Sequence, residues 1–219
     1  MLPPPAARLT MASASHRQRL ATVVEHLVSS GARSVLDLGC GEGELLQRLA
    51  KYECFERLVG IDIDDRALEA ARQALGLAMF PLRDERTQVR RGSFENSERD
   101  LCGFDAGVLL EVIEHVDPRR LACVERAVFG AMRPNTILVT TPNQEYNVLH
   151  DLAPGTLRHP GHHFEWPRAK FRQWAGGVAS RNAYRVCFFD IGQVDPARGS
   201  TTQMARFVRR DLETTRTTA

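Results

Sequence analysis

A short apolar segment that leads into a glycine-rich turn does most to constrain the fold of this 219-residue chain. Residues 34–38 are mainly apolar, residues 39–43 read G-C-G-E-G, and helical spacing resumes over residues 45–50. Glycine tolerates a positive φ and lets a ligand approach the backbone closely. The spacing is G-x-G-x-G, so the dinucleotide fingerprint G-x-G-x-x-G is not met. The pattern predicts a strand, a ligand-binding turn and a helix in succession.

The same alternation of strand and helix continues along the chain. Periodicity predicts further strands over residues 57–63, 88–91, 104–110 and 136–141, and helices over residues 18–29, 65–75, 118–132 and 168–175. Two final strands, over residues 184–191 and 204–208, can form an antiparallel hairpin at the sheet edge. We therefore expect an α/β fold with a doubly wound, mostly parallel seven-stranded sheet and an antiparallel edge hairpin. The folded domain is expected to cover residues 16–210, between disordered tails at 1–15 and 211–219.

Composition excludes some classes of protein and leaves others open. The net charge is only +2, so any nucleic-acid contact must be a local patch. Lysine occurs only at positions 51 and 170, which leaves 27 arginines among the 29 basic residues. A GC-rich genome or phosphate recognition would each explain that bias. The five cysteines form no C-x-x-C pair, and no signal peptide or membrane span is evident, so we expect a cytoplasmic protein with free thiols.

Two acids give the glycine turn its predicted ligand. Asp37 lies inside the motif D-x-G-x-G, and Asp62 ends the next predicted strand. An acidic lip suits a cationic ligand better than a pyrophosphate, and S-adenosylmethionine carries a sulfonium and an amino group. A carboxylate at the position of Asp62 can accept hydrogen bonds from both ribose hydroxyls. This set of features resembles the class I methyltransferases. A turn that binds nothing and a nicotinamide dehydrogenase are the alternatives.

A second set of polar residues follows the predicted strand 104–110. Glu111, Glu114 and His115 share one face if the chain turns into a helix there. Acidic residues are also common at the start of a helix, because the helix dipole stabilises negative charge there. A histidine at this position can simply be solvated. Three more histidines (His159, His162 and His163) follow the fifth predicted strand, and loops at strand carboxyl ends meet at the ligand crevice. Two carboxylates with two imidazoles suit Mn²⁺, our first choice, or Mg²⁺.

Four segments together resemble one family. They are E-V-I-E-H over residues 111–115, T-T-P-N-Q-E-Y-N over 140–147, R-H-x-x-H-x-F-E-W over 158–166, and T-Q-M-A-R-F over 202–207. The chain is similar to the small-RNA 3′-terminal ribose 2′-O-methyltransferases of the HUA-enhancer type, in their bacterial form. The resemblance covers roughly residues 17–209. It implies methylation of the 2′-hydroxyl of a 3′-terminal ribose of RNA, dependent on S-adenosylmethionine and a metal, in small-RNA stabilisation or RNA repair.

The resemblance also implies roles for individual residues. The metal ligands are then Glu111, Glu114, His115 and His162, although the adjacent His163 leaves the fourth ligand open. Gly161 stands where the family often has an acid. The implied cofactor residues are Arg19 at the methionine carboxylate, Asp37, Gly39 and Gly41 in the turn, Asp62 and Ile63 after the second strand, and Ser93 and Phe94 at the adenosine. The implied partners are an RNA 3′ end and an RNA end-healing and ligating protein.

Several points stay open from the sequence. His159 or His163 could take the hydroxyl proton, or could be a loop histidine bonded to backbone. Arg158, Arg168 and Arg172 are candidates for phosphate contacts. A metal-dependent methyltransferase of a small vicinal diol fits the same residues. So does a non-catalytic docking module with a methyltransferase fold.

Overall fold

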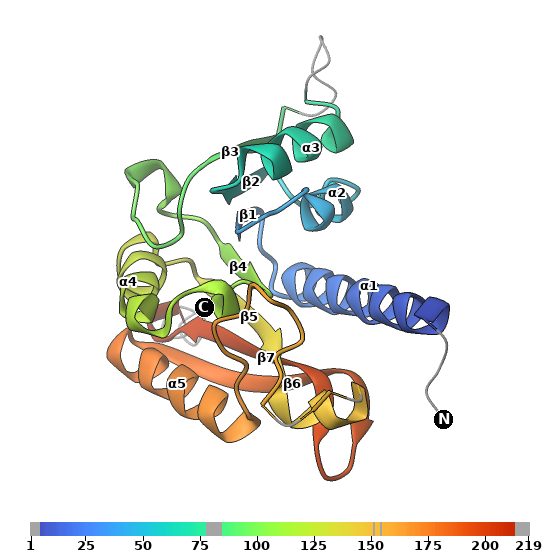
Figure 1. Cartoon of the computed structure of the whole chain (residues 1–219). Helices are drawn as coiled ribbons and strands as arrows, with labels where there is room; N and C mark the ends of the chain where they lie inside the picture. The colour runs from blue at the N-terminus through green and yellow to red at the C-terminus, as the bar shows by residue number, and fades with distance from the viewer. Residues whose placement is uncertain (1–4, 78–84, 151, 154, 213–219) are drawn as a thin grey trace.

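The protein contains one seven-stranded sheet, seen in a computed structural model that describes residues 5–77, 85–150, 152–153 and 155–212 (Figure 1). The strand order is β3-β2-β1-β4-β5-β7-β6. The strands are β1 Ser34–Leu38, β2 Arg57–Asp62, β3 Thr87–Arg91, β4 Ala106–Leu110, β5 Thr136–Pro142, β6 Tyr184–Asp195 and β7 Gly199–Arg209. The first five are parallel, and β7 lies antiparallel to both β5 and β6. The predicted fold class is confirmed.

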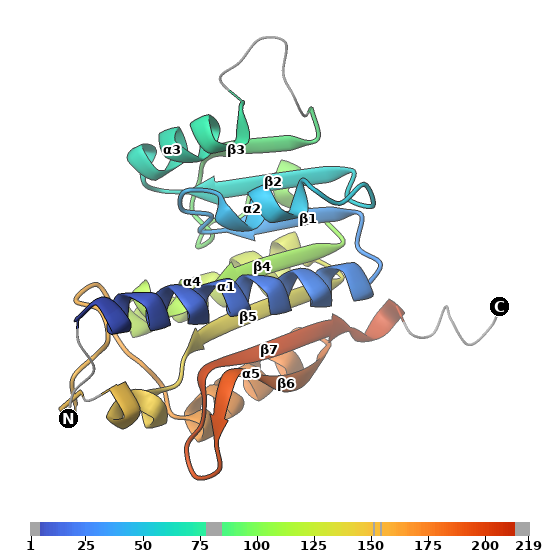
Figure 2. The ribbon, with the colours of Figure 1, turned by 90° about the vertical axis from the view of Figure 1, so that its right-hand side faces the viewer.

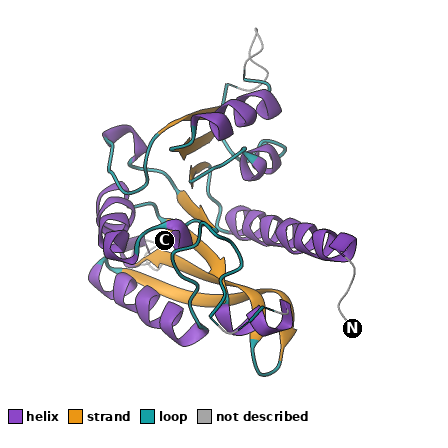
Figure 3. Ribbon diagram, in the orientation of Figure 1, coloured by secondary structure: helices purple, strands orange, loops and turns teal. Residues whose placement is uncertain are grey.

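Helices cover both faces of this sheet (Figures 1 and 3). On one face lie α1 Pro5–Ser29, α2 Glu44–Leu49 and α3 Asp65–Leu75, as the rotated view in Figure 2 shows. On the other lie α4 Leu121–Val124, which continues into a π-helical segment Glu125–Met132, and α5 Arg168–Arg181. Strand order reverses between β1 and β4, so a crevice opens at the carboxyl ends of these two strands.

The core divides between the two faces because side chains alternate along each strand. In β1, Val35 packs into the cluster under α1 and α2, whereas Leu36 packs into the cluster under α4 and α5. Val108 and Leu109 divide in the same way in β4. All four side chains are fully buried. Because these strands are buried on both faces, their sequences read as continuous apolar runs rather than alternating ones.

The termini and two elements differ from the sequence predictions. Helix α1 begins at Pro5 rather than near residue 18, so residues 5–15 of the predicted disordered tail are helical. Alanine, leucine and methionine in this stretch favour a helix. The predicted helix 118–132 is instead a 3₁₀ turn, α4 and the π segment. Strands β6 and β7 are longer than predicted, at 12 and 11 residues.

Other predictions fall partly outside the described residues. In the C-terminal tail predicted from residue 211, a 3₁₀ turn covers Arg210–Leu212, and residues 213–219 are not described. Between α3 and β3, residues 78–84 are likewise outside them. Within the described chain, no helix has the length and apolar character needed to cross a bilayer.

Candidate functional site

The turn after β1 needs glycine for two separate reasons. Gly39, Gly41 and Gly43 all have positive φ, at 84°, 52° and 79°. A Cβ on Gly39 would also lie 2.6 Å from the Val112 side chain and 3.5 Å from the Phe94 ring. The turn is therefore held against two segments that are distant in sequence, and a side chain at position 39 would push them away.

A cavity of about 250 Å³ lies beside this turn. Its lining includes Asp37, Gly39 and Gly41, together with Leu110 at the end of β4. Asp37 is only 2% exposed. Burial, and then the charge of Asp62, raises the pKa of Asp37 to about 7. The cavity thus has an acidic wall that a cationic ligand would stabilise in its ionised form.

Asp62, at the end of β2, braces the same turn. Its carboxylate accepts hydrogen bonds from the backbone N–H of Gly41 at 2.8 Å and of Asp64 at 2.9 Å. Ile63 is 66% exposed and does not line the cavity. Beyond β3, Ser93 accepts a hydrogen bond from the backbone N–H of Glu95 at 3.2 Å. Of the sequence-predicted cofactor residues, the structure thus brings Asp37, Gly39, Gly41, Asp62 and Phe94 to the glycine turn, whereas Ile63 is exposed away from the cavity lining.

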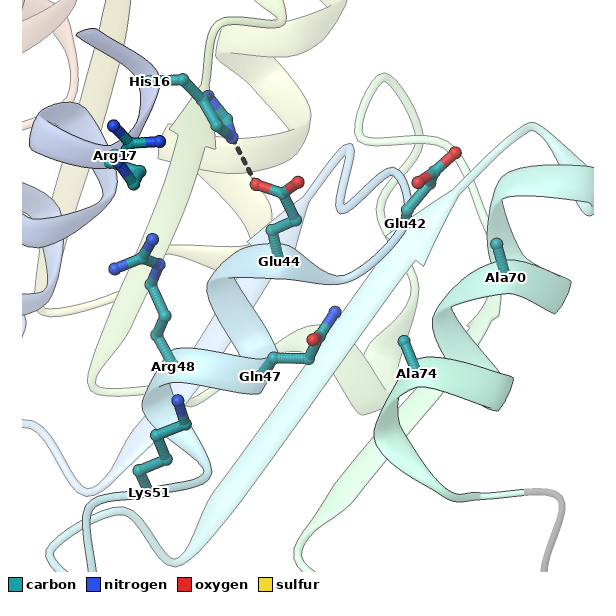
Figure 4. Close-up of a pocket in the computed structure, with 9 residues that line it drawn as sticks. All are labelled: His16, Arg17, Glu42, Glu44, Gln47, Arg48, Lys51, Ala70 and Ala74. Atoms are coloured by element: carbon teal, nitrogen blue, oxygen red, sulfur yellow. Dashed lines mark hydrogen bonds and ion pairs between the residues drawn. The ribbon is translucent and has the colours of Figure 1, made fainter. Parts of the chain in front are cut away.

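Helix α1 closes one end of the cavity. His16 of α1 pairs with Glu44 at the start of α2, and both side chains line the cavity. They also line a neighbouring groove of about 530 Å³, whose other walls carry Glu42, Arg48 and Lys51 (Figure 4). His16 was not predicted as a site residue, because it precedes the helix expected over residues 18–29 and only the longer α1 brings it against the glycine turn.

Arg19 connects this cavity to the second polar cluster. Its guanidinium donates to Glu111 Oε2 at 2.9 Å and to the Thr202 hydroxyl at 3.0 Å. The same guanidinium lies 3.2 Å from Nδ1 of His16. One side chain of α1 therefore joins a residue of the cavity to the first acid of the motif 111–115.

The motif 111–115 does not form an α-helix. Glu111 has a left-handed backbone with φ 54°, and Ile113–His115 forms a single 3₁₀ turn. Glu114 is fully buried, and its Oε2 accepts a hydrogen bond from the Thr141 hydroxyl at 3.0 Å. Burial and then the nearby charge of Glu111 raise the pKa of Glu114. Oε1 of Glu111 and Oε1 of Glu114 are both buried without a hydrogen-bond partner.

Three imidazoles gather next to this turn. One ring nitrogen from each of His115, His159 and His162 lies within 4.8 Å of the others. The acids Glu111 and Glu114 are not part of this compact group in the described chain. The side chain of His163 is also outside it, although its backbone N–H donates to the Glu114 carbonyl at 2.7 Å. Of the two histidines that the sequence left open, His162 is the one in the cluster.

Hydrogen bonds fix the orientation of two of these rings. Nδ1 of His115 lies 2.9 Å from the Gly161 carbonyl, and Nδ1 of His162 lies 2.6 Å from Oε1 of Glu165. The Glu165 carboxylate is buried and also accepts from the backbone N–H of Arg158 at 2.7 Å. Such outer partners set the tautomer and the direction of a ligating imidazole.

A buried polar network holds the loop that carries His159 and His162. Arg158 donates to Asn147 Oδ1 at 2.6 Å, to the Asn143 carbonyl and to the Thr201 carbonyl at 2.8 Å. The expectation that Arg158 contacts phosphate is therefore wrong, because its guanidinium is occupied inside the protein. The role of Glu165 was not predicted, although two of its partners, Arg158 and His162, lie within seven residues of it in the chain.

The other two arginines proposed for phosphate have partners on the surface. Arg168 donates to Glu145 at 2.8 Å, and Arg172 stacks 5.4 Å from the centre of the Phe188 ring. Both guanidinium groups therefore already have a partner within the protein.

Comparison with known proteins gives a consistent result. Residues 36–138 match a family model described as a methyltransferase domain. The methyltransferase domain of bacterial CtHen1-C is 41% identical, with a TM-score of 0.81 over 89% of this chain and 98% of that one. A small RNA 2′-O-methyltransferase of Xenopus tropicalis is 34% identical over 90% of this chain and 56% of its own length. The chain thus spans about half the length of the curated relatives it matches.

A more distant likeness concerns the fold alone. A chain in the Pnkp1/Rnl/Hen1 RNA repair complex is 19% identical, with a TM-score of 0.67 over 89% of this chain and 42% of that one. The likeness to CtHen1 is far stronger and covers almost all of that domain. It agrees with the sheet order, the glycine turn and the acid and histidine motifs described above. The chain therefore belongs to the Hen1 family of S-adenosylmethionine-dependent methyltransferases.

Proposed function

We propose that this chain transfers the methyl group of S-adenosylmethionine to the 2′-hydroxyl of the 3′-terminal ribose of RNA, with a divalent metal at the site. The observation that carries the proposal is the position of Arg19. Its guanidinium lies 3.2 Å from His16, which lines the cavity, and 2.9 Å from Glu111. A methyl-donor site and an acid and histidine cluster are thereby adjacent, as a transfer between two bound groups requires.

The cavity residues suit S-adenosylmethionine chemically. The acidic wall at Asp37 favours the sulfonium and amino groups, and Asp62 stands where ribose hydroxyls are bound in doubly wound folds. Arg19 offers a cation to the methionine carboxylate. We assign cofactor contacts to Arg19, Asp37, Gly39, Gly41, Asp62, Ile63, Ser93 and Phe94.

The residues of the second cluster fit a divalent metal. Oε1 of Glu111 and Oε1 of Glu114 are buried without partners, which is costly unless a cation or proton is supplied. His115 and His162 each have Nδ1 engaged by an acceptor, which leaves a lone pair on Nε2. We therefore assign the ligands as Glu111, Glu114, His115 and His162. Two oxygens and two imidazoles favour Mn²⁺ over Mg²⁺. A metal there would lower the pKa of a hydroxyl placed against it.

The protein's own residues would then orient the reacting groups. Glu165 and the Gly161 carbonyl fix the rings of His162 and His115. In the transfer, a bond forms between the 2′-oxygen and the methyl carbon, the bond from that carbon to sulfur breaks, and the hydroxyl proton passes to solvent water. Only a 3′-terminal ribose has adjacent free 2′- and 3′-hydroxyls, so a site that requires the pair would reject internal riboses.

The cellular setting is a separate part of the proposal. We infer a role in small-RNA stabilisation or RNA repair, the latter with an end-healing and ligating partner protein. The second setting rests on the resemblance of the motifs at residues 111–115 and 158–166 to the bacterial members of the family. Co-purification of the chain with an RNA ligase from its own source would test this setting.

The decisive experiment measures methyl transfer from labelled S-adenosylmethionine to a short RNA with a free 3′ end. Parallel reactions contain Mn²⁺, Mg²⁺ or a chelator, and a matched RNA ends in 2′-deoxyribose. We expect label only on the RNA with a 3′-terminal ribose and only with metal. Label that a small catechol receives in preference to RNA would instead support the small-diol methyltransferase. Cofactor binding without transfer to any acceptor would support the docking module.

A further inference from the structure

The three clustered histidines do not present the same chemistry. For His115, Nδ1 faces a backbone carbonyl, which can only accept, so this nitrogen carries the hydrogen. For His162, Nδ1 faces the Glu165 carboxylate, which accepts from Arg158 and Asn147 as well. Both rings therefore keep an unshared electron pair on Nε2, as metal ligands must.

His159 has the opposite arrangement. The backbone N–H of Gly161 donates to its Nδ1 at 3.0 Å. A nitrogen that accepts an N–H carries no hydrogen itself, so in the neutral ring the hydrogen is on Nε2. In this tautomer Nε2 can neither take a proton nor bind a metal. The expected role of His159 as proton acceptor is therefore not supported, because its remaining nitrogen is a hydrogen-bond donor.

The backbone of Gly161 sets the tautomers of both rings at once. Its carbonyl accepts from His115, while its N–H donates to His159. A Cβ on Gly161 would lie 3.1 Å from Nδ1 of His159 and 3.3 Å from Nδ1 of His115, tighter than most real contacts. Glycine at this position, where the family often has an acid, lets both rings approach the backbone of one residue closely.

We propose that His159 positions the substrate by donating its Nε2–H to the 3′-oxygen of the terminal ribose; this rests on the proposed function. His159 is exposed, and its ring centre lies 5.7 Å from that of His115 and 5.4 Å from that of His162. An exposed ring therefore stands beside the two proposed histidine ligands, where a substrate on the metal can meet it. A donor to the 2′-oxygen would occupy a lone pair that the methyl transfer needs. The 3′-oxygen forms no new bond in the reaction, so it can accept a hydrogen bond from His159 throughout.

The test compares His159→Ala and His159→Gln with the wild-type protein, with His162→Ala as the ligand control. Mn²⁺ affinity is measured by calorimetry, and RNA binding in the presence of Mn²⁺ by fluorescence anisotropy. The RNAs end in a 3′-hydroxyl or a 3′-deoxyribose. Methyl transfer is followed on the same RNAs.

We expect both His159 variants to bind Mn²⁺ within about threefold of wild type, whereas His162→Ala does not. His159→Ala should weaken binding of the 3′-hydroxyl RNA by roughly 5- to 20-fold, the size of one hydrogen bond. The amide N–H of His159→Gln should recover much of that loss. On 3′-deoxy RNA, which lacks the acceptor, His159→Ala should have almost no effect on binding.

Three outcomes would overturn the proposal. A loss of Mn²⁺ affinity in His159→Ala as large as in His162→Ala would make His159 a ligand. An equal loss of binding on both RNAs would place its partner elsewhere, such as a phosphate. Activity of His159→Ala restored by raised pH, with no recovery in His159→Gln, would make it a base. If the wild-type protein distinguishes the two RNAs in binding but methylates neither, the proposed function fails, and the binding comparison still tests the donor.

Discussion

The two halves of the candidate site are built in different ways. The centre of the cofactor half is one segment, residues 34–62, in which glycines with positive φ shape the turn between β1 and α2, although His16, Phe94 and Leu110 reach it from other segments. The histidine half joins a 3₁₀ turn at 113–115 to a loop at 158–166, and side-chain hydrogen bonds hold them together. The first half should therefore tolerate damage to the second, whereas the second depends on a distant polar network.

The largest expected effect is a loss of metal binding with cofactor binding unchanged. His162→Ala should reduce metal affinity by more than about 100-fold, because even an outer partner of a ligating histidine is typically worth about 10–100-fold. Affinity for S-adenosylmethionine should change less than about twofold. Calorimetry with each ligand checks both values. The matched control is His163→Ala, whose side chain lies outside the cluster. A greater loss of metal binding in His163→Ala would reverse the assignment.

A second substitution removes a side chain of the buried polar network rather than a proposed metal ligand. Arg158→Met removes the cation that joins Asn143, Asn147 and Thr201, and it leaves the Glu165 carboxylate buried beside an apolar chain. We expect a loss of about 3 kcal/mol in the free energy of unfolding, as for other broken buried ion pairs. Metal affinity should fall with it, since the loop carries His162. Chemical denaturation and calorimetry provide the readouts.

The control for this change is Arg172→Met, because Arg172 stacks on an aromatic ring at the surface. Its effect on stability should stay within about 0.5 kcal/mol, as is usual at surface positions. If Arg158 instead served RNA phosphate, Arg158→Met would leave unfolding unchanged and would lower the salt dependence of RNA binding.

The contrast between the halves also explains what the sequence could predict. The sheet, its antiparallel edge and the glycine turn follow from periodicity and from short motifs that lie within one segment. The histidines were found because three of them stand close together in sequence. The roles of His16 and Arg158 were not predictable, because their partners Glu44 and Thr201 are 28 and 43 residues away in the chain, and Asn147 reaches Glu165 across 18 residues. No periodicity links such pairs, so only the folded chain reveals them.

In the cofactor half, Asp37→Asn tests the acidic wall. Asp37 has a pKa of about 7, above the ordinary value near 4 for this residue type, so the folded state favours its protonated form. Its contribution to stability is complete below about pH 4 and is lost as the pH rises through 7. The cofactor-free wild type should therefore lose stability relative to Asp37→Asn between about pH 4 and pH 7. Thermal unfolding of both proteins at several pH values measures this difference.

Cofactor binding should follow the opposite trend. The cationic ligand favours the ionised acid, so the affinity of the wild type for S-adenosylmethionine should rise with pH through 7. In Asp37→Asn the affinity should be lower by about tenfold, the order of one charge-assisted hydrogen bond, and independent of pH over this range. Parallel pH dependence in both proteins would assign the titration to a group other than Asp37. Metal affinity should be the same in both proteins, because the substitution changes only the cofactor half.

The smallest expected effect comes from Gly161→Ala, and it asks how closely the histidine half is packed. The added methyl would lie 3.1 Å from Nδ1 of His159 and 3.3 Å from Nδ1 of His115, so the rings must shift by a few tenths of an ångström. Such a shift lengthens both hydrogen bonds of the Gly161 peptide without removing either. We expect RNA methylation to fall only a few-fold, because each bond contributes about 1 kcal/mol and is weakened rather than lost. Cofactor affinity should not change.

The matched control is Gly155→Ala in the same loop region, where a Cβ would meet nothing within 4 Å but the backbone φ is +81°. This variant carries backbone strain without crowding a ring, whereas Gly161→Ala crowds two rings. A greater loss of RNA methylation in Gly155→Ala would mean that loop conformation, not ring packing, limits the histidine half. A loss in Gly161→Ala alone would show that the two imidazoles work at the spacing that glycine permits.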